Sequence, residues 1–436
     1  MKKVILALTL VVLIVCASVM MFACKSSDEY VYKTQKEAYK YAAMDTLKVG
    51  AIMVGDETEG YTKAHMDGIN AAIEQVKAAN PGKNIEVIWK KKIGEDATCA
   101  TACEEAIAEG AKLIITNSYG HEFPIRDVIY ENPQVMFVSM TGDLAKVSGW
   151  SNWKNAFTNI YEARYVSGCI AGLKLRQLID DGKISADNKD ANGNIKIGYV
   201  GAYPYAEVVS GYTAFYLGVK HVVDNVVMTV QYTNSWFDFD AEKQTAASLI
   251  SSGCVIIGQH ADSEGAPTAC EEAFTSGKTV YSVGYNVSML KAAPNAALTS
   301  ASNNWDVYYS YLFSKMLAGE EIATDWSAGY TSIATNNSAV ACTPLGNSAA
   351  NGSVAYATAI KEAIVAGGKV FDCSRFTVNG EHLTTYTGAY GMNGAECIKS
   401  YDKADGTKGY YFDESTLRSA PYFDLRIDGI TEITKE

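Results

Sequence analysis

Short apolar strands alternate with amphipathic helices along most of the chain, and this alternation starts twice. The first series has strands expected at residues 47–54, 85–89, 113–116 and 135–139, and the second has strands expected at 196–201, 226–231, 255–259 and 279–284. Near-continuous apolar strands separated by helices are typical of parallel sheets that are covered on both faces. The pattern therefore predicts an α/β protein with two doubly wound lobes.

Later segments extend both lobes. Residues 297–317 predict one more strand and helix, which we expect to return to the first lobe. The expected N-terminal lobe is 47–155 plus 291–325, and the C-terminal lobe and tail are 156–290 plus 326–436, with hairpins near 377–392. Ligands of doubly wound sheets lie beyond the carboxyl ends of the strands. The cleft between the lobes is therefore where we expect a binding site.

The N-terminus has the pattern of a secretory signal. Lys2 and Lys3 precede an apolar run at residues 4–23, which is followed by Cys24 and a polar stretch. Residues 21–24 (MFAC) look like a bacterial lipobox, although Met21 replaces the usual leucine and Phe22 is bulky. We expect a signal peptide at 1–23, lipidation of Cys24 and a tether at 24–46. The alternative is an uncleaved membrane anchor, and either one places the rest of the chain outside the cytoplasm.

Charge and cysteine spacing exclude several classes of protein. The net charge is −12 and the acidic residues are spread along the chain. A nucleic-acid-binding protein needs a cationic face, so we expect no nucleic-acid partner. The eight cysteines after Cys24 match no zinc-ligand spacing, and Cys99 and Cys103 lie one helical turn apart, where a disulfide would be strained. We expect free, buried cysteines and no metal or cofactor.

Aromatic, amide and carboxylate side chains follow the expected strands, while lysine and arginine are nearly absent there. The candidate binding residues are Tyr61, His65, Tyr119, Trp236, Asp262, Asn286 and Trp305. A phosphate or carboxylate ligand would need a bidentate arginine or a glycine-rich loop. These positions favour a flat, uncharged ligand with N–H donors, stacked between rings. A heterocyclic base fits this description, and a sugar remains open because sugars also stack on aromatic rings.

Several ordered motifs give the chain a family resemblance. These are GYTKAHMDGIN (60–70), YEARYVSGCIAG (161–172), IGYVGAYPYAEVVSGYTAFYLGVK (197–220), NSWFDFDAEKQTAASLISSG (234–253), QHADSEG (259–265), VGYN (283–286) and LTSASNNW (298–305). From residue 47 to 311 the chain resembles the basic membrane protein family of extracytoplasmic purine and purine-nucleoside binding lipoproteins. It is especially similar to the purine-binding branch. The resemblance implies a type I periplasmic-binding fold with a purine in the interlobe cleft.

The same resemblance implies roles for individual residues. Tyr61 and Trp236 would hold the base between their rings, and Asp262 would accept hydrogen bonds from purine N–H groups, each contributing about 1.5–3 kcal/mol. The chain departs from its relatives at Asn286, where they usually have aspartate, and at Asn303, where nucleoside-binding relatives have lysine. In those relatives the aspartate and lysine hold ribose. The departures favour a free base such as adenine, hypoxanthine or guanine.

Structural alternatives remain for these residues. Trp236 could instead pack in the core, and Asp262 could cap the helix expected near Ala266. His65 could have a structural role. Tyr119, Asn286 and Trp305 are expected only as wall residues of the cleft.

The residues and the resemblance together predict a monomeric, lipid-anchored receptor that delivers a purine base to the permease of an ABC importer. A purine-nucleoside receptor and a ligand-sensing protein would share the same site residues. A secreted hydrolase is the third alternative, but the sequence has no D-x-D-x-x-x-D-D, G-x-S-x-G or H-E-x-x-H motif. We therefore expect a binding protein and not an enzyme.

Overall fold

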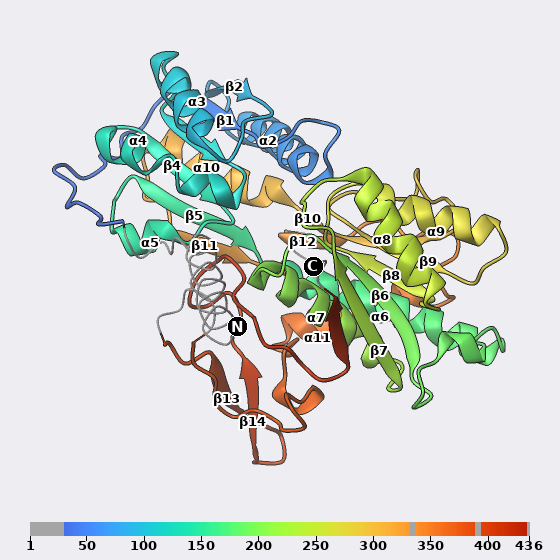
Figure 1. Cartoon of the computed structure of the whole chain (residues 1–436). Helices are drawn as coiled ribbons and strands as arrows, with labels where there is room; N and C mark the ends of the chain where they lie inside the picture. The colour runs from blue at the N-terminus through green and yellow to red at the C-terminus, as the bar shows by residue number, and fades with distance from the viewer. Residues whose placement is uncertain (1–29, 332–336, 389–393, 434–436) are drawn as a thin grey trace, which may run out of the picture. The chain divides into compact units, whose positions relative to one another are not determined.

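The computed structural model describes residues 30–331, 337–388 and 394–433 (Figure 1). The expected signal peptide and Cys24 lie outside the described residues. The chain divides into two compact units, residues 1–38 and 39–436, and the second contains every described helix and strand. No helix in the described ranges is long and apolar enough to cross a bilayer.

The first sheet has the strand order β11-β5-β4-β3-β1-β2, and all of its pairings are parallel. Its strands are β1 (Thr46–Ile52), β2 (Asn84–Lys90), β3 (Leu113–Thr116), β4 (Met136–Met140), β5 (Trp153–Thr158) and β11 (Asp325–Ala328). The helices α2 (Gly60–Ala79) and α10 (Trp305–Ala318) pack together over one face, around a core that includes Val49 and Ala51. On the other face, α3 (Ala97–Ala108) places Ala106 against Gly50. The short helices α4 (Arg126–Glu131) and α5 (Leu144–Ser148) complete this lobe.

The second sheet has the order β12-β10-β9-β8-β6-β7-β15, and only the β10–β12 pair is antiparallel among the described pairings. Its strands are β6 (Ile195–Gly201), β7 (Val226–Tyr232), β8 (Ile256–Gln259), β9 (Tyr281–Tyr285), β10 (Ala297–Asn303), β12 (Val340–Cys342) and β15 (Ile430–Ile433). The helices α6 (Ile160–Asp180) and α7 (Ala206–Lys220) pack on one face, and α8 (Phe239–Ser251) and α9 (Gly265–Thr275) pack on the other. Two parallel-sheet lobes confirm the predicted fold class.

The C-terminal part of the chain adds a helix and a hairpin. Helix α11 (Ser353–Val365) packs on α6, and β13 (Ile398–Asp402) pairs with β14 (Lys408–Phe412). Short 3₁₀ turns lie at η2 (Tyr119–Glu122), η3 (Ala186–Asn188) and η4 (Cys373–Arg375). The hairpins expected near 377–392 appear in the described residues only as the isolated bridges Val378–Glu381 and Thr387–Glu396.

Two strands join a different lobe from the one expected. β10 pairs with β9 in the second sheet, so only the helix that follows it returns to the first lobe. β11 pairs with β5 in the first sheet, although 326–436 was assigned to the second lobe. A short strand's own pattern does not specify which sheet edge it joins, so the sequence did not reveal the exchange. As a result the chain crosses between the lobes after β5, between β10 and α10, and after β11.

Two glycines set the close approach of α6 and α7. A β-carbon on Gly168 would lie 2.2 Å from the carbonyl oxygen of Phe215, and one on Gly218 would lie 2.1 Å from that of Tyr165. Both obstacles are backbone atoms of the facing helix, which a side-chain rotation cannot remove. The helices that support the second sheet therefore require glycine at both positions.

Gly168→Ala is expected to lower the free energy of unfolding by about 1–3 kcal/mol, because the added methyl group forces the two helices apart. Gly94→Ala is the matched control, since its β-carbon would meet only the flexible Asp96 carboxylate at 3.3 Å. Urea denaturation measures both changes. Equal stability of the two variants would contradict the account of this helix contact.

Candidate ligand-binding site

A cavity of about 310 Å³ lies between the two lobes, at the carboxyl ends of their strands. The first lobe contributes Val54, Gly55, Asp56, Thr58, Glu59, Tyr61, Lys92, Ser118, Tyr119 and Thr141, and the second contributes Glu207, Trp236, Phe237, His260, Asp262 and Tyr285. Most of these residues follow β1, β3, β4, β7, β8 or β9 directly. The volume is within the range of small-molecule sites, about 300–1,000 Å³.

Aromatic rings form much of the cavity wall. Tyr61 and Tyr119 come from the first lobe, and Trp236, Phe237 and Tyr285 come from the second. Trp236 is half-buried and packs edge-on against Tyr203, with ring centroids 5.2 Å apart. The indole is therefore supported by the second lobe while it lines the cavity, and it is not an enclosed core side chain.

Buried side chains fix the position of Tyr61. Its hydroxyl donates to the carbonyl oxygen of Asn117 at 2.7 Å, and the ring of His65 lies edge-on behind it at 4.5 Å. His65 stacks on Trp305 at 4.3 Å and shares a 2.6 Å hydrogen bond with the hydroxyl of Tyr309. His65 and Trp305 are almost fully buried and do not line the cavity. The wall position expected for Trp305 is therefore wrong, and His65 has the structural role that was its alternative, because α2 and α10 direct both side chains into the core of the first lobe.

Asp262 lines the cavity and is held by an amide pair. Its Oδ1 accepts a 2.7 Å hydrogen bond from Nδ2 of Asn286, whose Oδ1 accepts one of 3.1 Å from Asn303. Glu264 occupies the N-cap position of α9, so Asp262 does not have the capping role. Asn286 is buried outside the cavity wall, contrary to expectation, because its side chain is engaged by Asp262 and Asn303.

The acidic side chains are crowded on one side of the cavity. Burial raises the pKa of Asp262 well above its ordinary value, and the nearby carboxylates of Glu59, Glu242 and Glu207 raise it further. Burial also raises the pKa of Glu59, although this carboxylate caps α2 by accepting from the N–H groups of Tyr61 and Thr62 at 2.7 and 2.8 Å. N–H donors bonded to these carboxyl groups would favour their charged forms and lower their pKa values.

The cations around the cavity have partners within the protein, although Nε and Nη2 of the buried Arg164 have no hydrogen-bond acceptor among the described residues. Lys92 lines the cavity and forms a 2.7 Å ion pair with Asp56. Arg164 is buried behind Tyr285, with its guanidinium carbon 3.6 Å from the ring centroid, and donates to the carbonyl oxygen of Gln259 at 2.6 Å. Burial and this arginine lower the pKa of His260 to about 4, so the imidazole is neutral near pH 7.

The structure thus places Tyr61, Tyr119, Trp236 and Asp262 in one cavity wall, and leaves His65, Asn286 and Trp305 behind it. Further wall residues had no assigned role in the sequence prediction: Glu59, Lys92, Glu207, Phe237 and Tyr285. Tyr285 and Phe237 lie in the motifs VGYN and NSWFD, which was a usable signal. Glu207 lies in the first turn of α7, where a glutamate is ordinarily explained by the helix dipole.

Two parallel-sheet lobes, three crossings and a cavity between them define an α/β solute-binding protein of the periplasmic type. The solved solute-binding protein of an ABC transporter from Aeropyrum pernix K1 is similar, with a TM-score of 0.58 and 14% identity over 74% of this chain and 92% of that one. The model of the PnrA-like family of ABC transporter substrate-binding proteins matches residues 47–331. The chain belongs to this family. Its fold and family are those of binding proteins that act outside the cytoplasm.

Curated relatives differ in what they bind. A purine-binding protein of Brucella abortus (strain 2308) is 30% identical over 268 residues, which cover 61% of this chain and 68% of the relative. A putative ABC transporter glucose-binding protein of Haloferax volcanii is 29% identical over 206 residues, covering 47% of this chain and 46% of the relative. The relatives of this chain are therefore named for different ligands.

Among the residues that the structure describes, no group of histidine, cysteine, aspartate and glutamate is arranged to hold a metal ion. The seven cysteines from Cys99 to Cys373 are free, and all but the half-buried Cys342 are buried.

The stability of the ligand-free protein should depend on the protonation of Glu242. This buried carboxylate accepts from the backbone N–H of Ser263 at 3.1 and 3.2 Å, and burial raises its pKa to about 7. Because the folded pKa exceeds the unfolded one, its favourable contribution is complete near pH 4 and is lost as the pH rises through 7. Between pH 5 and 8 the wild type should lose about 1–3 kcal/mol of unfolding free energy relative to Glu242→Gln.

Denaturation curves at several pH values measure this difference. Glu272→Gln, at an exposed position on α9, is the control and should keep the wild-type pH dependence. Parallel pH profiles for the wild type and Glu242→Gln would contradict the predicted role of Glu242.

Proposed function

We propose that this chain is a lipid-anchored receptor that binds an adenine-like purine base in the interlobe cavity and delivers it to the permease of an ABC importer. The observation that carries the proposal is the cavity wall itself, in which aromatic rings from both lobes surround buried carboxylates. The cations nearby are paired with Asp56 or stacked on Tyr285. Such a wall suits a flat nitrogen heterocycle better than an anion.

Both lobes would contribute to ligand binding, through stacking and hydrogen bonding. Tyr61 from the first lobe and Trp236 from the second are proposed to hold the two faces of the base. Asp262 is proposed to bond its N–H edge, with Asn286 holding the carboxylate in place at 2.7 Å. The purine-binding relative from Brucella abortus supports this ligand class.

The amide pair supports a base over a nucleoside. Asn286 and Asn303 bond each other, and Asn303 also accepts a 2.5 Å hydrogen bond from Thr158. Both amides are thus committed within the protein and lie outside the cavity wall. A purine-nucleoside receptor and a ligand-sensing protein remain the alternatives. A sugar ligand, which the name of the Haloferax volcanii relative suggests, is the competitor to include in any binding assay.

Calorimetric titration of residues 25–436, which contain the whole second compact unit, tests which ligand the protein binds. Adenine is expected to bind more tightly than adenosine or guanosine, with guanine and hypoxanthine as further candidates. Heat from glucose alone, with none from any purine, would overturn the proposal.

Trp236→Ala should weaken adenine binding by about 1–3 kcal/mol, because one stacking face is lost. Phe239→Ala is the matched control, since Phe239 is a neighbouring exposed aromatic residue that does not line the cavity. The same titration measures both variants. If Trp236→Ala binds adenine as tightly as Phe239→Ala does, the indole is not part of the binding site.

Lipid anchoring is tested separately from binding. Expression of the full chain with labelled fatty acid should label the wild type and Cys16→Ala but leave Cys24→Ala unlabelled. Cys16 is a suitable control because it lies in the apolar run before the expected cleavage point. Label on Cys24→Ala would contradict lipidation at this cysteine, and a membrane-bound wild type without label would favour the uncleaved anchor.

A further inference from the structure

The chain continues well beyond the family match, and one segment of this extension contacts both lobes. The match ends at residue 331, whereas the described chain runs to 433. We call residues 413–422 the strap. It follows β14 and precedes β15, so both of its ends lead into structure of the extension itself.

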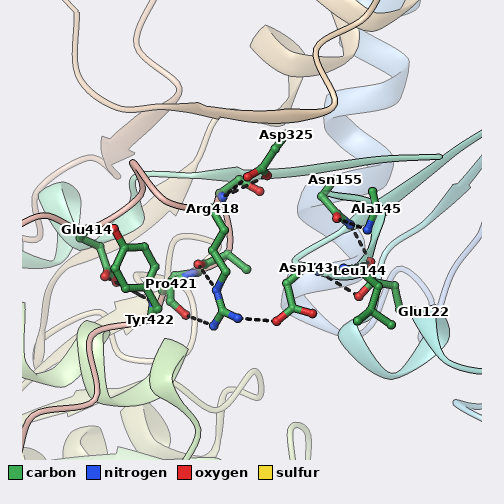
Figure 2. Close-up of polar contacts among 12 residues, drawn as sticks. Glu122, Asp143, Leu144, Ala145, Asn155, Asp325, Glu414, Arg418, Pro421 and Tyr422 are labelled. Carbon is green, nitrogen blue, oxygen red and sulfur yellow. Dashed lines mark hydrogen bonds and ion pairs between the residues drawn. The ribbon is translucent and has the colours of Figure 1, made fainter. Parts of the chain in front are cut away.

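The strap is tied to the first lobe by side-chain and backbone contacts (Figure 2). The guanidinium of Arg418 points at Asp143 and forms an ion pair with it. The next backbone N–H, that of Ser419, donates to both carboxylate oxygens of Asp325 at 3.0 Å. The ammonium group of Lys146 adds a 3.0 Å hydrogen bond to the carbonyl oxygen of Leu417. These contacts reach α5, the loop before it, and β11.

The same strap is tied to the second lobe. Glu414 accepts a 2.7 Å hydrogen bond from the hydroxyl of Ser210 on α7. Glu414 also accepts from the backbone N–H of Tyr422 at 3.2 Å. The Tyr422 ring is fully buried in the core of the second lobe. The strap therefore connects the two lobes through non-covalent contacts with each of them.

The ion pair at its centre is rigidly held and nearly dry. Arg418 donates to the carbonyl oxygens of Ala420 and Pro421, both at 3.1 Å, so its guanidinium is fixed by the strap itself. On the other side, Glu122 accepts from the backbone N–H groups of Asp143 and Leu144 at 2.9 and 3.1 Å. The Arg418 and Asp143 side chains are only 10% and 13% exposed. Separating such a pair leaves two poorly solvated charges, so lobe motions that pull it apart are strongly opposed.

The strap also lies beside the ligand cavity. Arg418, Ala420 and Pro421 line a small recess together with Tyr119, Thr141, Glu207 and Trp236, and these last four also line the cavity. The lobes meet directly nearby, since the backbone N–H of Gly60 donates to the carbonyl oxygen of Asp262 at 3.4 Å. An opening of the cleft at this point must either break the strap's contacts with the first lobe or carry the strap away from the second.

We propose that the strap holds the two lobes together beside the cavity and thereby favours the closed arrangement even without ligand. Arg418 is the positioning residue of this device, because its ion pair with Asp143 is the bridge to the first lobe. If the closed form is already populated, ligand binding does not have to supply the full free energy of closing the lobes. Such a protein binds its ligand more tightly and releases it more slowly. The claim about ligand exchange rests on the proposed binding function, whereas the claim about lobe opening does not.

Small-angle X-ray scattering of residues 25–436 without ligand tests lobe opening. Arg418→Gln and Asp143→Asn each remove the ion pair from one side and should each increase the radius of gyration relative to the wild type. Arg426→Gln is the matched control, because Arg426 pairs with Glu432 inside the extension at 3.0 Å and does not reach the first lobe. Its radius should equal that of the wild type. Circular dichroism identifies any variant that fails to fold, and the other variant then decides the outcome.

Adenine dissociation, followed by stopped-flow tryptophan fluorescence, tests the effect on ligand exchange. Arg418→Gln and Asp143→Asn should release adenine at least threefold faster than the wild type and Arg426→Gln.

Unchanged radii of gyration for both Arg418→Gln and Asp143→Asn would overturn the strap proposal. If the wild type binds no adenine, the proposed function fails while the scattering comparison still decides the role of the strap.

Discussion

The buried carboxylate of Asp262 is the interaction on which the interpretation of the cavity depends. Its pKa is raised by burial and by neighbouring acids, and a single amide, that of Asn286, bonds its Oδ1. Keeping such a group charged with one neutral side-chain donor is costly. The rest of the cavity follows from this constraint, because aromatic walls provide contact area for a ligand while adding no competing charge. A ligand with N–H donors satisfies both features at once.

The architecture brings these groups together by crossing the chain between lobes. Because the parallel strands of both sheets end at the same gap, Tyr61 and Tyr119 face residues that follow β7, β8 and β9. The crossings after β5 and between β10 and α10 make each lobe depend on distant parts of the sequence. The C-terminal extension adds a further link, since the strap bonds Asp143 in one lobe and Ser210 in the other.

The sequence predicted the strands of both lobes and part of the cavity wall, because local residue patterns encode these features. Continuous apolar runs indicated the buried parallel strands, and the residues just after them indicated Tyr61, Tyr119, Trp236 and Asp262 as cavity wall. Local patterns did not show which side of a helix faces the cavity. His65, one helical turn after Tyr61, was therefore a candidate binding residue although it lies in the core of the first lobe. Nor did they show the exchange of β10 and β11, because pairing at a sheet edge depends on distant partners. Lys92 and Glu207 reach the cavity, and the strap reaches the recess beside it, only through tertiary packing.

The central claim is that a flat nitrogen heterocycle lies between the two lobes with its N–H edge against Asp262. A crystal structure of residues 25–436 grown with adenine tests this claim most directly. The account predicts the ring between Tyr61 and Trp236, with a ring or exocyclic nitrogen within about 3.2 Å of an Asp262 oxygen. Adenine bound elsewhere, or an indole of Trp236 turned into the core of the second lobe, would contradict it.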